Sequence, residues 1–116
     1  MHKIETLDVY QRAYALILEI YKNTKSFPKE EIYGLSSQMQ RSAISIGSNL
    51  MEGWHRGTDG EYKHFVGIAI GSAAELKCQM MIAKDLNYIS SEKSELLIKE
   101  IGEIISMLIG LHNSIK

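Results

Sequence analysis

Two pairs of the form Glu-x-x-His are the residues of this sequence best suited to metal chemistry. They are Glu52 with His55 and Glu61 with His64. In helical bundles, two such pairs together with two further glutamates bind a pair of metal ions. Glu19 and Glu103 are candidates for the further ligands, but nothing in the sequence brings them near the pairs. Because both pairs flank one turn between helices rather than the middle of a bundle, we expect no metal site.

Nucleophilic catalysis finds little support among the remaining residues. The single cysteine, Cys78, lies near the apolar stripe of a helical segment, where we expect an inert thiol in the core. The glycines lie within helical patterns, and no Gly-Lys-Ser/Thr sequence follows a strand, so no phosphate-binding loop is indicated. We therefore predict no catalytic residue and no cofactor.

One helical segment has a polar face made of residues with directional hydrogen-bonding groups. These residues, spaced three or four apart, are Gln38, Arg41, Ser45, Asn49, Glu52 and Arg56. A solvated face usually carries lysine and glutamate, yet no lysine occurs between Lys29 and Lys63. Three hypotheses fit this face: a solvated surface, a polar network between helices, or a ligand surface. We favour the network, in which Arg41 and Glu52 would balance each other's charge.

Basic residues suggest RNA binding as a further hypothesis. The candidates lie on or near the first two helical segments and are Arg12, Lys22, Lys25, Lys29, Arg41 and Arg56. Residues 1–29 hold five basic and three acidic residues, whereas the whole chain has a net charge of -1. A strongly basic domain would indicate nucleic acid more clearly. In a ring, however, symmetry would repeat a weak basic patch and make it multivalent.

Four segments have the apolar period of a helix, and no alternating strand pattern persists. The segments cover residues 8–25, 35–56, 59–86 and 91–114. Apolar stripes run through them, with residues such as Leu16, Ile46, Leu76 and Ile101 at three- and four-residue steps. A chain of 116 residues is long enough for one domain, residues 1–116, and not for two.

The breaks between these segments have the chemistry of helix ends. Pro28 cannot continue the first helix. Thr58 followed by Glu61 forms a capping box, and Ser90 or Ser91 can cap the last helix. The second and third connections are only a few residues long, which makes neighbouring helices antiparallel. The expected fold is all-α, an antiparallel up-down-up-down four-helix bundle.

The helices carry more apolar surface than a lone four-helix bundle can cover, because each helix there needs only one apolar stripe. The segment from Phe65 to Ala74 is uncharged all the way round, and the run from Ala13 to Leu18 is nearly all apolar. The residues that we expect at an interface between copies are Gly67, Gly71, Ile98, Gly102, Ile105, Ser106, Ile109 and Gly110. The alternative is that the small residues allow close packing inside one bundle. We predict a homo-oligomer.

Composition is typical of a soluble protein, with 45% hydrophobic and 23% charged residues. The first residues are polar, so no secretory signal is indicated, and the uncharged run 65–74 is too short to span a membrane. A single cysteine excludes an internal disulfide and suits a reducing compartment. We expect a cytoplasmic protein with no membrane partner.

Several motifs spread over nearly the whole chain resemble those of a known family. They are residues 27–35 (FPKEEIYGL), Gln38, 41–43 (RSA), 45–46 (SI) and 49–53 (NLMEG), then Glu61, Phe65, Ala69, 71–73 (GSA) and 75–76 (EL), with Leu7, Val9, Tyr10 and Ala13 near the start. Together they make the sequence similar to the four-helix-bundle proteins encoded in intervening sequences of bacterial 23S ribosomal RNA genes.

The resemblance implies an antiparallel four-helix bundle that assembles into a ring, with a pentamer as the expected size. It implies a relation to accessory proteins of diversity-generating retroelements, which bind nucleic acid and a reverse transcriptase, and it implies no enzyme activity. Our leading hypothesis is a non-enzymatic homo-oligomeric scaffold that binds RNA or an RNA–protein complex. The first alternative is a purely protein-binding oligomeric scaffold, and the second is a metal-dependent helical-bundle enzyme.

Overall fold

The structure is a computed structural model, and it describes residues 3–116 of the chain. Its four long helices are α1 (Asp8–Thr24), α2 (Leu35–His55), α3 (Asp59–Asp85) and α4 (Ser91–Ser114). Two short 3₁₀ helices, η1 (Ile4–Thr6) and η2 (Lys29–Glu31), precede α1 and α2. No strand occurs within residues 3–116. The prediction of an all-α chain with four helices is confirmed, and each helix end lies within one residue of its expected place.

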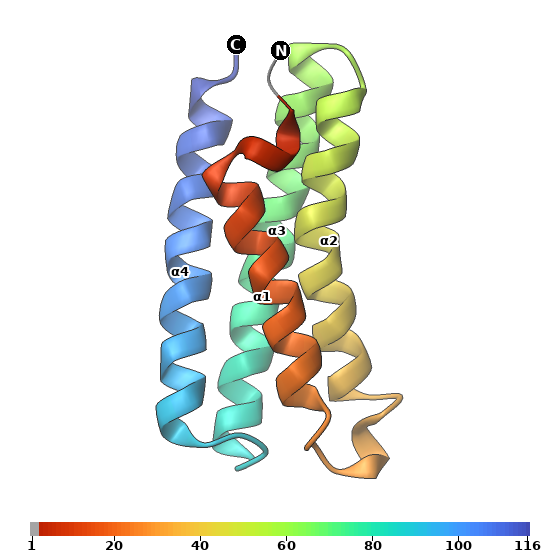
Figure 1. Cartoon of the computed structure of the whole chain (residues 1–116), viewed down its shortest axis with the longest axis vertical. Coiled ribbons are helices and arrows are strands. Elements are labelled where there is room, and N and C mark those ends of the chain that lie inside the picture. Colours follow the sequence, from red (N-terminus) through yellow and green to blue (C-terminus); the bar gives the residue numbers. More distant parts are fainter. Residues whose placement is uncertain (1–2) are drawn as a thin grey trace.

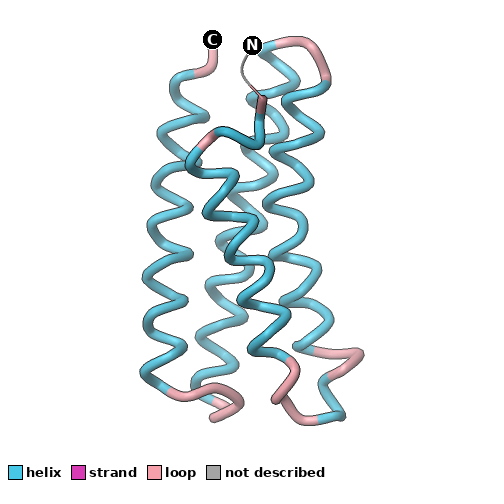
Figure 2. Tube along the Cα trace, in the orientation of Figure 1, coloured by secondary structure: helices cyan, strands magenta, loops and turns pink. Residues whose placement is uncertain are grey.

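The four helices lie side by side along one long axis, and Figure 1 shows the chain running down α1, up α2, down α3 and up α4. The molecule measures 43 × 24 × 20 Å. The α2–α3 turn lies at one end, and the α1–α2 and α3–α4 loops lie at the other (Figure 2). Packing is most extensive between α2 and α3 and least extensive between α1 and α4. Within residues 3–116 the backbone of α1 does not come close to that of α3, nor that of α2 to that of α4, so the helices form four sides in the order of the chain.

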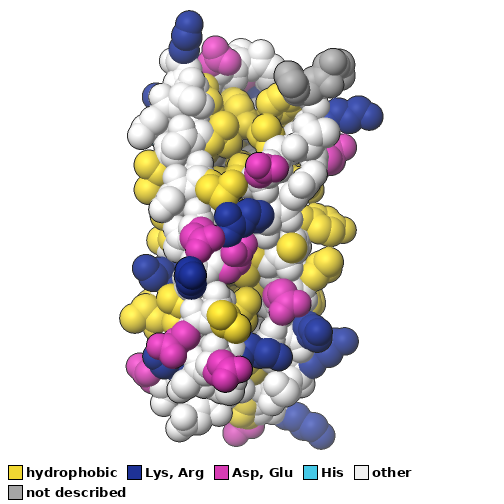
Figure 3. Space-filling view, turned by 60° about the vertical axis from the view of Figure 1, so that its left-hand side comes forward, with side chains coloured by type: hydrophobic (Ala, Val, Ile, Leu, Met, Phe, Trp, Pro, Cys, Tyr) yellow, Lys and Arg dark blue, Asp and Glu magenta, His cyan; other side chains and the backbone are white. Residues whose placement is uncertain are grey.

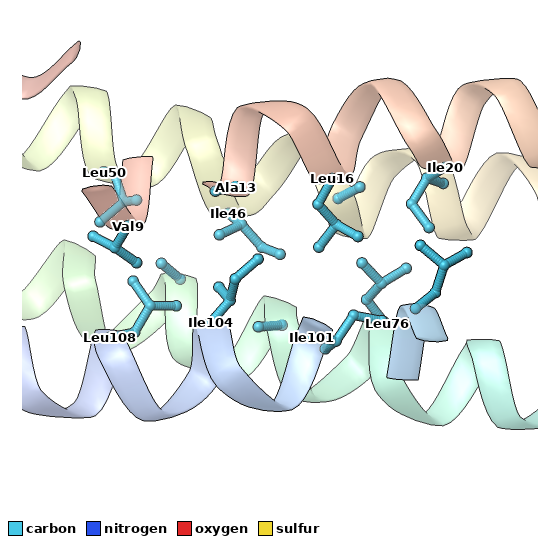
Figure 4. Packing of buried hydrophobic residues seen from close by; sticks show 14 of the residues in the cluster. Val9, Ala13, Leu16, Ile20, Ile46, Leu50, Leu76, Ile101, Ile104 and Leu108 are labelled. Carbon is cyan, nitrogen blue, oxygen red and sulfur yellow. The ribbon is translucent and has the colours of Figure 1, made fainter. Parts of the chain in front are cut away.

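Each helix buries one apolar stripe in a shared core. The stripe residues recur every three or four positions, because a helix has 3.6 residues per turn. Figure 4 shows these side chains meeting between the ribbons of the four helices. The largest fully buried side chains are Ile4, Leu16, Ile20, Met39, Ile46, Leu50, Val66, Leu76, Met80, Ile101, Ile104 and Leu108. Burying one such side chain contributes about 1.5–3 kcal/mol, which makes this core the main source of stability.

Side-chain caps begin α3 and α4 at the residues that the sequence indicates. Thr58 Oγ1 accepts a hydrogen bond from the backbone N–H of Glu61 at 3.2 Å, and Ser90 Oγ accepts one from the backbone N–H of Lys93 at 3.2 Å. These bonds satisfy amide groups that have no partner within their own helix. Just before α3, Gly57 has a φ of 93°, a conformation that glycine adopts without steric cost.

Glu31 ties the loop before α2 to the loop before α4. Its Oε1 accepts a hydrogen bond from the backbone N–H of Leu35 at 2.9 Å, and its Oε2 accepts one from the Tyr88 hydroxyl at 2.8 Å. The bond from Leu35, followed by that from Tyr88, lowers the pKa of Glu31. The Tyr88 ring packs on Phe27, with ring centroids 5.4 Å apart. A Cβ at Gly34 would lie 2.6 Å from Glu31 Oε1, so this glycine leaves room for the cap.

A second glycine lets α2 approach α3 near their connecting turn. A Cβ on Gly53 would lie 2.6 Å from Phe65 Cβ and 3.4 Å from the Tyr62 ring. Ordinary carbon contacts are about 3.5–4.0 Å long, so any larger residue at this position would push the two helices apart. Tyr62 also meets Trp54 edge to face, with ring centroids 5.5 Å apart. Gly53 therefore gives up helix propensity and permits the close packing of α2 on α3.

Gly53→Ala is expected to lower the free energy of unfolding by about 1–3 kcal/mol, because the added methyl group overpacks the contact with Phe65. Gly60→Ala is the matched control, since a Cβ there meets nothing within 4 Å. Urea denaturation followed by circular dichroism measures both variants. Equal stabilities for the two would show that α2 and α3 pack without needing this glycine.

Candidate functional site

A polar hollow of about 460 Å³ lies on the α2–α3 side of the molecule. Its lining residues are Gln38, Arg41, Ser42, Ser45, Ser72 and Glu75. The structure therefore brings three residues of the expected polar face of α2 together with three residues that the sequence analysis does not select for a site. Those three are Ser42, Ser72 and Glu75. All of them lie inside the motifs that carry the family resemblance, which is the information that could have identified them.

Hydrogen bonds across the hollow link α2 to α3. Ser45 Oγ and Ser72 Oγ lie 2.8 Å apart, and Ser42 Oγ donates to Glu75 Oε1 at 3.2 Å. Asn49 Nδ2 supports the first pair, since it donates to the Ser45 carbonyl at 2.7 Å and to Ser45 Oγ at 2.8 Å. One residue of the expected polar face, Ser45, therefore forms a hydrogen bond with α3, and Ser42 beside that face forms a second one with Glu75.

The prediction that Arg41 and Glu52 balance each other's charge is wrong. Glu52 Oε2 instead accepts a hydrogen bond from Arg56 at 2.6 Å, one helical turn away. Arg56 also lies 3.7 Å from Glu61 and stacks over the Phe65 ring, 4.9 Å from its centroid. Glu52 and Arg56 are thus a pair four residues apart, and Glu61, just beyond the turn into α3, is the further acidic partner of Arg56. Arg41 is exposed and forms no ion pair within residues 3–116.

Among the residues expected to contact nucleic acid, Arg12 instead binds two glutamates of α4. Its guanidinium donates to Glu100 at 2.6 and 2.9 Å and to Glu103 at 2.6 Å. A further nitrogen of Arg12 lies 3.3 Å from Met107 Sδ. The hydrogen bond from Arg12 lowers the pKa of Glu103, and the bonds to Glu100 and Glu103 raise the pKa of Arg12. Arg12 therefore fastens α1 to α4 across the pair of helices that packs least extensively.

The lysines near the end of α1 remain available. Lys22, Lys25 and Lys29 are exposed, and none of them forms an ion pair in the part of the chain that the structure describes. Lys22 belongs to the last turns of α1, Lys25 follows it, and Lys29 begins η2. Together with Arg41, they are the expected basic contacts that have no acidic partner.

The residues of the metal hypothesis do not gather. Within residues 3–116, no group of three or more His, Cys, Asp or Glu side chains is placed to hold a metal ion. Glu61 Oε2 accepts a hydrogen bond from the Thr58 hydroxyl at 3.4 Å, while Glu103 Oε1 accepts one from Arg12 at 2.6 Å. His64 packs edge to face on Phe65, with ring centroids 5.5 Å apart. The two glutamates of the Glu-x-x-His pairs, Glu52 and Glu61, both lie within ion-pair distance of Arg56.

The prediction that Cys78 is a core thiol is wrong, because this cysteine is exposed. The buried stripe of α3 continues through Leu76 and Met80. Two residues correspond to about 200° of helix turn, so Cys78 points away from the stripe that Leu76 marks. Proximity in the sequence to core residues did not indicate the direction of this side chain.

The expected interface residues lie on the α3–α4 side. Ile98 and Ile105 are half-buried, Ile109 is 44% exposed, and Ser106 is exposed. A Cβ on Gly67 would make only ordinary contact with His112, at 3.8 Å. At three other positions a Cβ would meet nothing within 4 Å; these are Gly71, Gly102 and Gly110. Close packing inside one bundle therefore does not explain these three glycines.

The sequence analysis missed a second apolar side, which lies along α1 and α2. Its exposed residues are Tyr14 (54%), Leu18 (58%), Tyr21 (39%) and Ile44 (41%). The three α1 residues recur at steps of four and three, so they form one stripe. Ile44 lies between Gln40, which donates to Thr24 of α1, and Gly47, whose Cβ would lie 3.1 Å from Ile17 of α1. The nearly apolar run 13–18 was the available indication of this side.

Helix α3 is strongly apolar, although the core covers only part of its surface. Among the described residues, it is the one helix long and apolar enough to cross a membrane, with a mean hydropathy of 1.3. This is weak evidence for a membrane span, because a core helix of a soluble protein can pass the same test. Only 33% of the apolar window is buried in the bundle. The helix therefore presents apolar surface outward.

A family model described as "23S rRNA-intervening sequence protein" matches residues 5–110. The chain belongs to this family. Its fold is similar to a crystal structure of a protein of unknown function from the S23 ribosomal protein family of Bacteroides thetaiotaomicron. The two share 21% sequence identity with a TM-score of 0.83, over 91% of this chain and 96% of the other. No curated protein matches the chain.

Arg12→Met is expected to lower the melting temperature at pH 7, because it removes the link from α1 to Glu100 and Glu103. The pKa of Glu103 is lowered in the folded protein. The stabilisation of the fold by the ion pair of Glu103 with Arg12 is therefore present above the ordinary carboxyl value of 4.5 and is lost as the pH falls through the lowered pKa. The difference in melting temperature between this variant and the parent should therefore become smaller at acidic pH. Lys22→Met is the control and should show no such pH dependence. A constant difference from pH 7 to pH 2 would contradict this role of Arg12.

Proposed function

We propose that this member of the 23S rRNA-intervening sequence family is a non-enzymatic homo-oligomeric scaffold that binds RNA or an RNA–protein complex. The observation that carries the proposal is that one bundle has two apolar sides, which lie opposite each other. The α1–α2 side carries Tyr14, Leu18 and Tyr21, and the α3–α4 side carries the isoleucines with the uncovered glycines. Large exposed apolar patches on a soluble protein usually mark interaction sites.

The two sides between the apolar ones carry polar groups, and Leu96 is an exposed apolar residue on the α4–α1 side. The α2–α3 side holds the polar hollow, and the α4–α1 side holds Arg12 with its two glutamates. Figure 3 shows the α4–α1 side, with charged side chains near its middle and apolar side chains both at its edges and between the charged groups. Such an alternation suits association through two sides while the other two stay in contact with solvent. It supports an assembly in which each copy uses both apolar sides.

The two apolar sides differ in shape, which favours contact between unlike sides. On the α1–α2 side, tyrosine and leucine side chains project, whereas uncovered glycines on the α3–α4 side leave space near the backbone. Contacts between unlike patches are head-to-tail, and they give a ring when the rotation closes. We propose a ring of up-down-up-down bundles, and we take five copies from the family resemblance.

RNA is the partner that we favour. The family resemblance implies a relation to accessory proteins that bind nucleic acid, and three lysines that form no ion pair within residues 3–116 lie close together in the chain, at 22, 25 and 29. A ring would repeat this cluster once per copy, so that several weak contacts could act together. A purely protein-binding scaffold is the alternative, and the net charge of -1 favours it. Both versions place the protein in the cytoplasm and off the membrane.

The parent chain is expected to have a mass of about 66 kDa in light scattering coupled to size exclusion, five times its 13.1 kDa. Ile109→Glu should reduce this mass, because it buries a charge in the α3–α4 side of the contact. Leu96→Glu is the matched control on the same helix, since Leu96 is 66% exposed on the side of α4 that carries Glu100 and Glu103. A parent mass of 13.1 kDa at micromolar concentration would contradict the proposal.

RNA affinity is expected to be salt-dependent and to fall when Lys22, Lys25 and Lys29 are changed together to Glu. For single strands, the slope of log affinity against log salt is about -0.7 per neutralised phosphate, so this variant should also have a shallower slope. The control changes the exposed Lys3, Lys93 and Lys116 to Glu, which gives the same net charge. Fluorescence anisotropy with a single-stranded oligoribonucleotide measures both. An equal loss of RNA affinity in the two variants would show that the cluster of Lys22, Lys25 and Lys29 is not a specific contact.

A further inference from the structure

The polar hollow on the α2–α3 side holds two opposite charges that do not pair. Of the three arginines in the chain, Arg12 and Arg56 are in ion pairs and Arg41 is not, within residues 3–116. Glu75 accepts one hydrogen bond, from Ser42, and forms no ion pair among the same residues. Arg41 and Glu75 both line the hollow. The hollow therefore offers a free guanidinium and a free carboxylate oxygen at separate positions.

The floor of the hollow is held in place by hydrogen bonds. Ser45 and Ser72 bond to each other at 2.8 Å, and Asn49 fixes Ser45 from the next turn of α2. The floor joins the two helices that pack most extensively, so little rearrangement is needed to receive a ligand.

A buried acceptor lies on the same side of α3. Gln79 follows Glu75 by four residues and Ser72 by seven, so the three share one face of the helix. Gln79 is only 5% exposed, and its Oε1 is buried without a hydrogen-bond partner. Buried polar atoms rarely stay unpaired. This wall therefore has more acceptor capacity than the protein's own donors use.

The lining is unlike that of two common classes of binding site. Sites for small molecules are mostly apolar and enclose the ligand, whereas every residue lining this hollow is polar. Protein interfaces have apolar centres from which charged residues are depleted, and this hollow has two charged residues. A polymer with a polar, charged backbone fits such an open surface better than a small molecule or a protein does.

The charges indicate which backbone fits. Arginine binds phosphate through two parallel hydrogen bonds, so Arg41 suits a phosphate. Glu75 would repel a phosphate that brought no donor, so the ligand must present a hydroxyl or amine close to its anionic group. RNA carries such a donor, the ribose 2′-hydroxyl, beside each phosphate, and DNA does not.

We infer that this hollow binds the ribose-phosphate backbone of RNA, with a phosphate on Arg41 and a 2′-hydroxyl on Glu75. The inference rests on the proposed RNA-binding function and adds its selectivity for RNA over DNA. No aromatic side chain lines the hollow, so no base stacks there, and contacts to phosphate and sugar carry no base information. Binding at this site is therefore independent of base sequence.

The test is a fluorescence anisotropy titration of the full chain with a single-stranded oligoribonucleotide and with the deoxyribonucleotide of the same sequence. Arg41→Gln should weaken RNA binding about tenfold, as expected for a lost charge-assisted bond. Glu75→Gln should bring the RNA and DNA affinities closer together, because the neutral amide is a weaker acceptor for the 2′-hydroxyl. Lys93→Gln and Glu92→Gln are the matched controls on exposed residues and should leave both affinities unchanged.

The outcomes separate this inference from the function on which it rests. If the parent binds neither strand, both fail. If the parent binds RNA, but Arg41→Gln and Glu75→Gln keep its affinity and its RNA-to-DNA ratio, the hollow is not the site and the proposed function stands. Competition by a free ribonucleoside monophosphate at concentrations equal to those of the oligonucleotide would also overturn the inference, because it would identify a nucleotide pocket. Competition that needs a large excess supports the polymer backbone as the ligand.

Discussion

Burial of one apolar stripe per helix is the constraint on which the rest of this molecule depends. The core takes the stripe residues of all four helices, and α3 still has apolar surface left over, since only 33% of its apolar window is buried. Part of the surplus, such as Met81, lies toward α4, and the α1–α2 side carries exposed apolar residues as well. The other two sides hold ion pairs and the polar hollow. One sequence thus specifies a core, two sides suited to association and two sides suited to solvent or a polar partner.

Much of the fold could be predicted from the sequence, because local chemistry determines the helix ends. Thr58 and Ser90 are capping residues in a chain with one proline, and both cap helices in the structure. The apolar period likewise predicts which residues form the core stripe, because a helix has a fixed number of residues per turn. The polar face of α2 and the surplus apolar surface followed from the same periodicity. These features depend on residues close together in the chain.

The pairing of charges between helices could not be predicted, because it depends on residues far apart in the chain. Arg12 binds Glu100 and Glu103, which lie on α4, and the sequence offers many other acidic residues. Arg56 takes Glu52 from its own helix, and this leaves Arg41 without the partner that spacing suggested. Which side chains line the hollow likewise depends on the register of α2 against α3. That register is set by close contacts such as the one at Gly53, which no local pattern reveals.

The mass of a mixture of two variants tests head-to-tail association most directly. Leu18→Glu damages the α1–α2 side and Ile109→Glu damages the α3–α4 side, so each variant alone should have a mass near 13.1 kDa. Mixed in equal amounts, the intact α3–α4 side of the first variant can meet the intact α1–α2 side of the second. Light scattering should then give about 26 kDa, twice the chain mass of 13.1 kDa. A mixture that stays at 13.1 kDa, or single variants that keep the parent mass, would contradict association between these two sides.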